Sequence, residues 1–93
     1  MYDRILKKMQ DCIRTRKYVM TLHAEEEMVD DNLSIFDVER IILNGKIIER
    51  QKDKTTKEWK YIIEGETISL AIASIVSKLS ITGTLVIVTV YKT

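Results

Sequence analysis

The chain has 93 residues, of which 45% are hydrophobic and 31% are charged, so we expect residues 1–93 to form one folded domain rather than a disordered segment. Its 15 basic and 14 acidic residues nearly cancel, which gives no indication of a nucleic-acid partner, and its single cysteine, Cys12, excludes an intrachain disulfide and a thiolate zinc cluster. No apolar stretch approaches the roughly 18 residues of a membrane span, and we expect a cytoplasmic protein without membrane contact.

The first third of the chain has helical periodicity. Apolar residues recur with helical spacing over residues 2–13, which predicts an amphipathic helix. Residues 17–21 are too few for a clear pattern, and they predict either a brief strand or the lead into a second helix. That second helix is expected over residues 22–32, where most residues favour helix.

A third helix is predicted between Ser34 and Gly45. Ser34 is a good N-cap, and Asp37 stands at the third helical position in a variant of the capping box. The pair Asn44-Gly45 is expected to end this helix, with Gly45 at a position of positive φ.

The rest of the chain predicts β-structure. Strands are expected over residues 46–51, 58–64, 68–79 and 85–91, and the third is long enough to contain a bulge or a bend. Helices followed by strands indicate an α+β fold, with the N-terminal helices packed on one face of a four-stranded antiparallel sheet. The opposite face stays half open and is the expected place for a functional site.

His23 is the only histidine and the first candidate for a general acid or base. On a helix, His23, Glu27 and Asp31 share one face because they are four residues apart. This row is compatible with a metal site, an acid–base pair, a solvated acidic face or a patch that meets a basic partner. Acidic residues dominate residues 23–45, whereas the segments on either side are basic.

Basic and aromatic residues alternate later in the chain. Lysines at 52, 54, 57 and 60 surround Trp59 and Tyr61, as in surfaces that bind phosphates and stack bases. Exposed lysines also protect edge strands from unwanted pairing, so the sequence leaves two interpretations open, contact with nucleic acid and protection of a strand edge. Glu49 and Arg50 are neighbours on a strand and point to opposite faces. Lys78, Thr89 and Tyr91 are polar residues in otherwise apolar strands. Phosphate-binding glycine loops and nucleophile elbows are absent, which argues against nucleotide-dependent and serine-hydrolase chemistry.

Several short motifs follow one another along the chain: Leu22-His23-Ala24 with Met28, Leu33-Ser34, Asp37-Val38-Glu39, Gly45, Glu49-Arg50-Gln51-Lys52-Asp53, Trp59-Lys60-Tyr61 and the apolar run 85–91. Together they resemble a small bacterial family, the domain of unknown function family 4258, over roughly residues 18–92. That family is similar to the RelE- and BrnT-type toxins, which cut messenger RNA without a cofactor and are silenced by an antitoxin protein.

The resemblance implies a RelE-like fold and the toxin of a type II toxin–antitoxin pair, whose partner is a small zinc-finger antitoxin. It implies a cofactor-free and metal-free endoribonuclease with its site on the sheet face. In this site His23 or Glu49 would be the base and Tyr91 the acid. Arg50 with Lys60 or Lys78 would hold the phosphate, and Lys54 and Lys57 would add contacts to RNA.

One departure favours other hypotheses. Relatives often carry arginines where this chain has Glu27 and Asp31, and an acidic row would repel RNA but could face an antitoxin. The alternative function is therefore a small dimeric partner protein that kept the fold and lost the activity. A metal-dependent hydrolase at His23, Glu27 and Asp31 is a third hypothesis.

Overall fold

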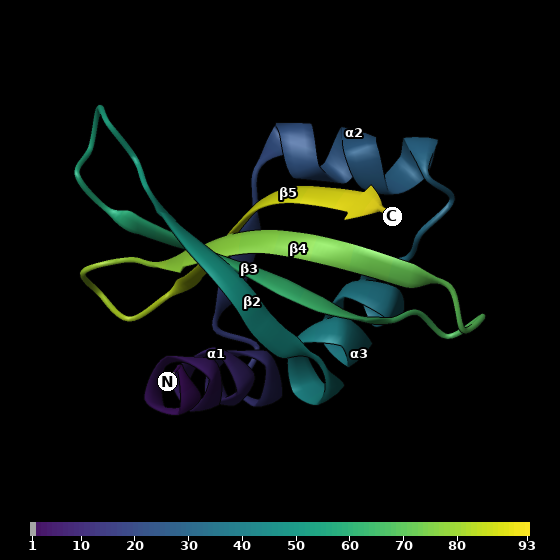
Figure 1. Cartoon of the computed structure of the whole chain (residues 1–93), viewed down its shortest axis with the longest axis horizontal. Coiled ribbons are helices and arrows are strands. Elements are labelled where there is room, and N and C mark those ends of the chain that lie inside the picture. Colours follow the sequence, from purple (N-terminus) through teal and green to yellow (C-terminus); the bar gives the residue numbers. More distant parts are fainter. Residues whose placement is uncertain (1) are drawn as a thin grey trace.

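A computed structural model describes residues 2–93 and contains three helices and five strands (Figure 1). In chain order they are α1 (Asp3–Arg14), β1 (Tyr18–Met20), α2 (Leu22–Asp30), α3 (Ile35–Asn44), β2 (Lys46–Lys52), β3 (Trp59–Glu66), β4 (Ile72–Leu79) and β5 (Leu85–Lys92). The predicted α+β class is confirmed. No helix in this described part of the chain is long and apolar enough to cross a membrane.

The predicted four-stranded antiparallel sheet is wrong, because the sheet has five strands in the order β1-β5-β4-β3-β2. The additional strand, β1, pairs in parallel with β5, so the sheet is mixed. A three-residue strand is too short to show an alternating pattern, and its place depends on pairing with residues 85–87.

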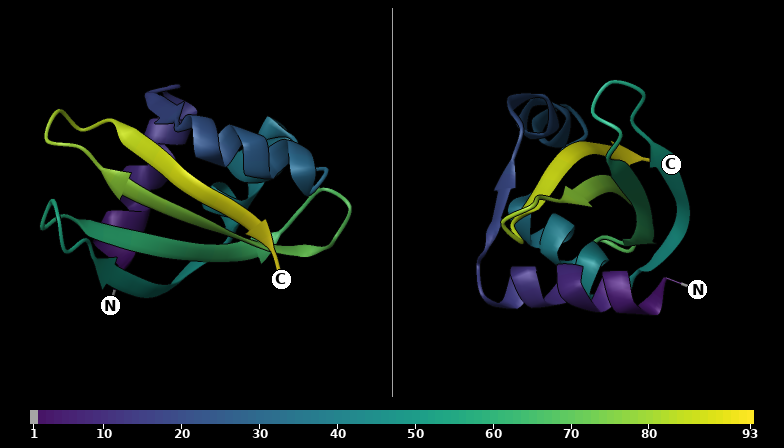
Figure 2. Two further views of the ribbon diagram at one scale, coloured as in Figure 1. Left: turned by 90° about the horizontal axis from the view of Figure 1, so that it is seen from above. Right: turned by 90° about the vertical axis from the view of Figure 1, so that its left-hand side faces the viewer.

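Two of the three helices cover one face of the curved sheet (Figure 2). α1 and α3 lie on that face and contribute Met9, Val38, Ile41 and Ile42 to the core. The facing strand residues are also fully buried, and they are Ile63, Ala73, Ile75, Leu85, Ile87 and Val90. α2 instead runs beside β5, at the edge of the sheet. This arrangement leaves the opposite face of the central strands without a helix.

Both ends of α3 are attached to the sheet by specific backbone contacts. At its start the predicted capping box is present, since Ser34 accepts from the Asp37 N–H and Asp37 accepts from the Ser34 N–H at 2.8 Å. The second oxygen of Asp37 accepts the N–H of Ile68 at 2.8 Å, which ties α3 to the loop before β4. Asp37 is only 8% exposed, so these bonds are largely shielded from water.

At the other end, Gly45 does not have the predicted positive φ, because its φ is −86°. Glycine is required at position 45 because other backbone atoms approach its Cα closely, and not because the backbone adopts a positive φ. A Cβ at this position would lie 2.4 Å from the carbonyl oxygens of both Ile41 and Glu64. The α3–β2 junction therefore presses directly against the backbone of β3.

The long strand predicted over residues 68–79 is shorter in the structure, because β4 begins at Ile72. Residues 67–71 form a loop in which Leu70 has a positive φ of 69°. The irregularity in this part of the sheet lies on the neighbouring strand, where Val88 is an extra residue between the pairs Val76–Thr89 and Ser77–Ile87.

We expect Gly45→Ala to destabilise the fold by about 3 kcal/mol, because a methyl group would force the α3–β2 junction away from β3. Gly83→Ala is the matched control. Gly83 has a φ of +83°, and a Cβ there would meet only Nζ of Lys17, at an ordinary contact distance of 3.7 Å, so we expect a loss of only about 1–2 kcal/mol from backbone strain. Urea unfolding of the two variants measures this difference, and an equal loss would contradict the close-approach explanation.

Asp37→Asn should lower stability by about 2 kcal/mol near neutral pH, because the amide keeps one acceptor and loses the charge. Burial raises the pKa of the Asp37 carboxyl, but the N–H groups of Ile68 and Ser34 and the Ser34 hydroxyl together hold this pKa below its usual value. The ionised carboxyl therefore stabilises the fold fully above the unfolded pKa of about 3.9, and this contribution is lost as pH falls through the lower folded pKa.

Thermal melts at neutral pH and at about pH 2 test this expectation. The wild type and Asp37→Asn should differ at neutral pH and converge in acid. Asp30→Asn, an exposed change on α2, is the control and should have little effect at either pH. A deficit of Asp37→Asn that is the same at both pH values would show that the charge is not the stabilising feature.

Candidate functional site

The face of the sheet opposite α1 and α3 is the first candidate site. Register defines it: Glu49 pairs with Ile62, Ile62 with Val76, and Val76 with Thr89. Because paired residues share a face and alternate residues return to it, one set of side chains lies here. We call this set the outer face, and it includes Glu49, Gln51, Lys60, Ile62, Glu64, Ser74, Val76, Lys78, Val86, Thr89 and Tyr91. The register thus places four of the predicted site residues on one face, namely Glu49, Lys60, Lys78 and Tyr91.

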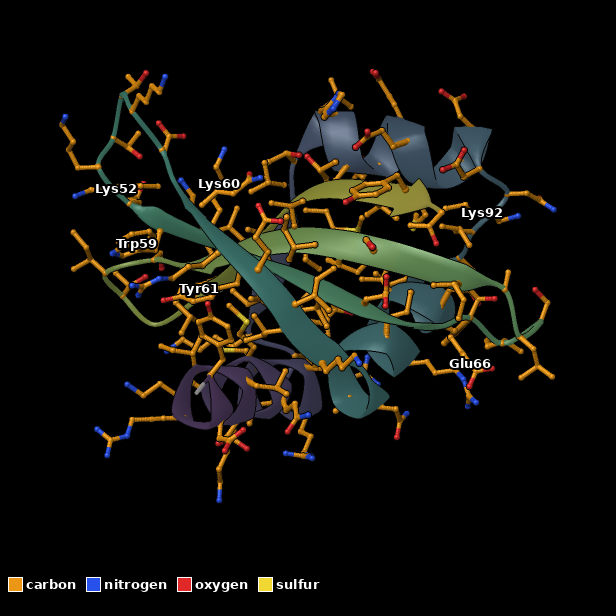
Figure 3. The ribbon with its side chains drawn as sticks, viewed as in Figure 1. Lys52, Trp59, Lys60, Tyr61, Glu66 and Lys92 are labelled. Carbon is orange, nitrogen blue, oxygen red and sulfur yellow. The ribbon has the colours of Figure 1, made fainter. Side chains whose placement is uncertain are left out.

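Arg50 does not lie with them. It pairs with Tyr61, a core residue, and therefore projects to the face that carries α1. Its guanidinium carbon lies 4.1 Å from the centre of the Trp59 ring, and the Lys52 ammonium lies 5.6 Å from the same centre. Figure 3 shows Lys52 and Trp59 together at the β2–β3 hairpin, with Lys60 and Tyr61 on opposite sides of β3. The expectation that Arg50 lines the same sheet face as Lys60 and Tyr91 is corrected.

Both outer-face lysines already have acidic partners. The Lys78 ammonium donates to Glu58 at 2.9 Å, and Lys60 lies 3.5 Å from Asp53. The hydrogen bond from Lys78 lowers the pKa of Glu58, and that of Asp53 is lowered first by the N–H groups of residues 55 and 56. A phosphate on this face would have to compete with these carboxylates. Neither partner was singled out from the sequence, because both come from the hairpin turn.

Lys54 and Lys57 lie in that turn, away from the centre of the outer face. Both side chains are exposed, and Lys57 has a positive φ of 65°. Their position suits contacts with a large ligand at the hairpin end better than contacts with a group bound near Tyr91.

His23 lies near the start of α2, which begins at the N-cap Thr21. The Thr21 hydroxyl donates to the Val88 carbonyl at 3.1 Å, so this end of α2 is held against β5. The Nε2 atom of His23 is 3.3 Å from Oε1 of Glu27, and the imidazole is two-thirds exposed. The same Glu27 oxygen accepts the N–H of Val90 at 3.1 Å. Glu27 therefore contacts both His23 and the backbone of the strand that carries Tyr91.

The acidic row on α2 has a structural task that the sequence did not reveal. β1 pairs with β5 only over residues 85–87, which leaves the later N–H groups on this edge without a strand partner. Glu27 accepts from Val90, and Asp31 accepts from Lys92 at 3.0 Å. Within residues 2–93, no three His, Cys, Asp or Glu side chains gather as ligands for a metal ion. The row completes the sheet edge and protects it from further pairing.

The two candidate general bases, Glu49 and His23, differ in their position relative to Tyr91. Glu49 and Tyr91 stand on β2 and β5, three strand spacings apart, which is on the order of 14 Å. One phosphate cannot contact both carboxylate and phenol at that separation. His23 is on α2, which packs directly against β5, the strand that carries Tyr91. Tyr18 is a poor acid, because burial and its 2.6 Å hydrogen bond to Glu39 raise its pKa to about 12.

We expect Glu27→Ala to destabilise the protein by about 1 kcal/mol and to increase amide exchange at Val90. The reason is that the Val90 N–H loses the Glu27 carboxylate as its hydrogen-bond acceptor. Glu26→Ala is the control, since Glu26 is on the same helix and exposed. Hydrogen exchange followed by NMR measures both variants. Unchanged exchange at Val90 in Glu27→Ala would mean that the carboxylate does not cap the β5 edge.

Comparison with protein-family models gives a match that covers most of the chain. Residues 20–92 match the family model described as "Domain of unknown function (DUF4258)". No curated protein and no solved structure matches the chain.

Proposed function

The chain belongs to the DUF4258 family, and we propose that it is the toxin of a bacterial type II toxin–antitoxin pair. In this proposal it is a RelE-like endoribonuclease that cuts messenger RNA in the cytoplasm without a cofactor and is silenced by a partner antitoxin. One observation carries the proposal: Glu27 lies 3.3 Å from His23 and accepts the N–H of Val90, on the helix that packs against β5, the strand that also carries Tyr91.

Cleavage of RNA by its own ribose hydroxyl needs a base, an acid and positive charge near the phosphate. In the proposed site His23 removes the proton of the 2′-hydroxyl, and the resulting oxygen attacks the adjacent phosphorus. Tyr91 protonates the 5′-oxygen as its bond to phosphorus breaks. Glu27 keeps the imidazole oriented through its own bond to the Val90 N–H.

In this proposal Lys60 and Lys78 bind the phosphate of the RNA. Lys60 and Lys78 exchange Asp53 and Glu58 for phosphate oxygens when RNA binds, since all four side chains are partly exposed. Glu49 stays too far from Tyr91 to act on the same phosphate, and Arg50 lies on the other face. In this proposal the catalytic residues are therefore His23 and Tyr91.

Purified protein should cut single-stranded RNA in the presence of EDTA and leave 2′,3′-cyclic phosphate ends. We expect His23→Gln and Tyr91→Phe each to reduce the rate by about 100-fold or more, the usual contribution of a positioned acid or base. Glu25→Gln, on the exposed side of α2, is the control and should cut at the wild-type rate. Cleavage that His23→Gln leaves unchanged would remove His23 from the mechanism.

A second function is favoured by the pairing of the outer-face charges. Lys60, Lys78 and Glu49 each have an internal partner, which suits a stable binding surface without catalysis. A folded wild-type protein that neither cuts RNA nor arrests bacterial growth on induction would favour this partner protein over the toxin.

A further inference from the structure

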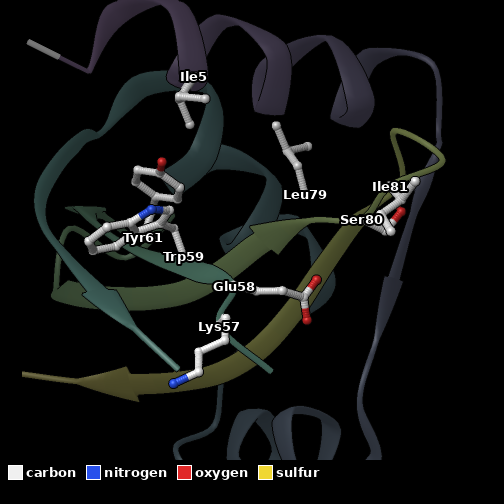
Figure 4. Close-up of a pocket in the computed structure, with 8 residues that line it drawn as sticks. All are labelled: Ile5, Lys57, Glu58, Trp59, Tyr61, Leu79, Ser80 and Ile81. Atoms are coloured by element: carbon white, nitrogen blue, oxygen red, sulfur yellow. The ribbon is translucent and has the colours of Figure 1, made fainter. Parts of the chain in front are cut away.

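A hollow of about 320 Å³ opens at the end of the sheet where the β2–β3 and β4–β5 turns lie (Figure 4). Its wall is mainly apolar and combines α1, both turns and the strand ends. We call it the Trp59 pocket, lined by Ile5, Lys57, Trp59, Tyr61, Leu79 and Ile81. Trp59 and Tyr61 project to the α1 face, so this pocket is separate from His23 and Tyr91.

Apolar surface remains open to water here. The side chain of Ile81 is fully exposed at the tip of the β4–β5 turn, and Trp59 is 39% exposed. Exposed apolar residues that gather around a hollow mark a binding surface more strongly than isolated ones do. Ile81 serves no packing role within the chain, which makes it a natural contact for another molecule.

The surroundings of the pocket are positively charged. Arg50 and Lys52 rest on the Trp59 ring, and Lys54 and Lys57 stand in the adjoining turn. In the described part of the chain, none of these four side chains takes part in an ion pair. The acids of the same hairpin, Asp53 and Glu58, are paired with Lys60 and Lys78. Glu58 lines the pocket, but its charge is balanced, so the cations determine the local potential.

We propose that the Trp59 pocket binds an acidic peptide segment of a partner protein. An apolar side chain of that segment fills the pocket against Leu79 and Ile81. Flanking carboxylates pair with Arg50, Lys52 and Lys57, which have the spare positive charge. This site is on the opposite face from the proposed ribonuclease centre and does not depend on RNA cleavage.

The lining favours a peptide over a nucleobase. A base would press its hydrogen-bonding edge against Ile5, Leu79 and Ile81, which leaves polar atoms without partners. An aliphatic or aromatic side chain has no such atoms to desolvate. Arg50 already stacks on the Trp59 ring at 4.1 Å, which reduces the aromatic surface that a base could stack upon.

The experiment selects random nonapeptides, displayed on phage, against the immobilised wild-type protein. We expect selected sequences to combine at least two acidic residues with a nearby apolar residue. Ile81→Glu should weaken the selected peptides by at least tenfold, because it removes apolar contact and adds repulsion. Ile81 is fully exposed, so this change leaves the fold intact. Val29→Glu is the matched control, since Val29 is 72% exposed on α2. This variant should bind the selected peptides as tightly as the wild type does.

Trp59 is the only tryptophan, so its fluorescence reports directly on the pocket. Synthetic copies of the selected peptides, free of tryptophan, should shift its emission saturably and bind more weakly as salt increases. Selection that yields no acidic–apolar peptides, or peptides that bind Ile81→Glu as tightly as the wild type, would overturn the proposal. A saturable response to single-stranded RNA that Ile81→Glu abolishes would also overturn it, because the pocket would then belong to nucleic acid.

Discussion

The attachment of α3 to the sheet at both ends is the constraint on which the rest of the structure depends. At one end Asp37 joins the helix start to Ile68, and at the other Gly45 lets the helix end meet the backbone of β3. With α3 held in this way, one face of β3 and β4 is buried under helices. The opposite face carries no helix, and there the charged and polar side chains of the outer face surround the buried Ile62 and Val76.

Single extra residues in the strands then decide which side chains share a face. Ile48 is an extra residue in β2, and it shifts the alternation so that Glu49 faces outward and Arg50 faces the α1 side. Val88 has the corresponding effect in β5 and places both Thr89 and Tyr91 outward. Without the shift at Ile48, Arg50 would lie near Lys60, and the two basic groups would form one surface instead of two.

Local signals explain what the sequence predicted well. The three helices and the Ser34–Asp37 capping box depend on residues within one or two turns of each other, and they were predicted correctly. Strands β2, β3 and β5 were also predicted, but which distant residues pair with one another was not, and residues 17–21 were left open between a brief strand and the lead into a helix. The strand β1 exists because it pairs with residues 85–87, and Glu27 finds its partner 63 residues away at Val90. A bulge such as Ile48 likewise depends on the partner strand, so the face of Arg50 could not be read from alternation alone.

The distribution of carboxylates connects the edge, the outer face and the pocket. Glu27 and Asp31 are engaged by the β5 backbone, while Asp53 and Glu58 are engaged by Lys60 and Lys78. These four carboxylates therefore bind either the unpaired N–H groups at the sheet edge or the lysines of the outer face. In the β2–β3 hairpin the charge outside these ion pairs is positive, and it lies beside Trp59 on Arg50 and Lys52 and in the adjoining turn on Lys54 and Lys57. A nearly neutral chain thus presents a local positive surface, because charge balance over the whole sequence does not fix where its unpaired charges lie.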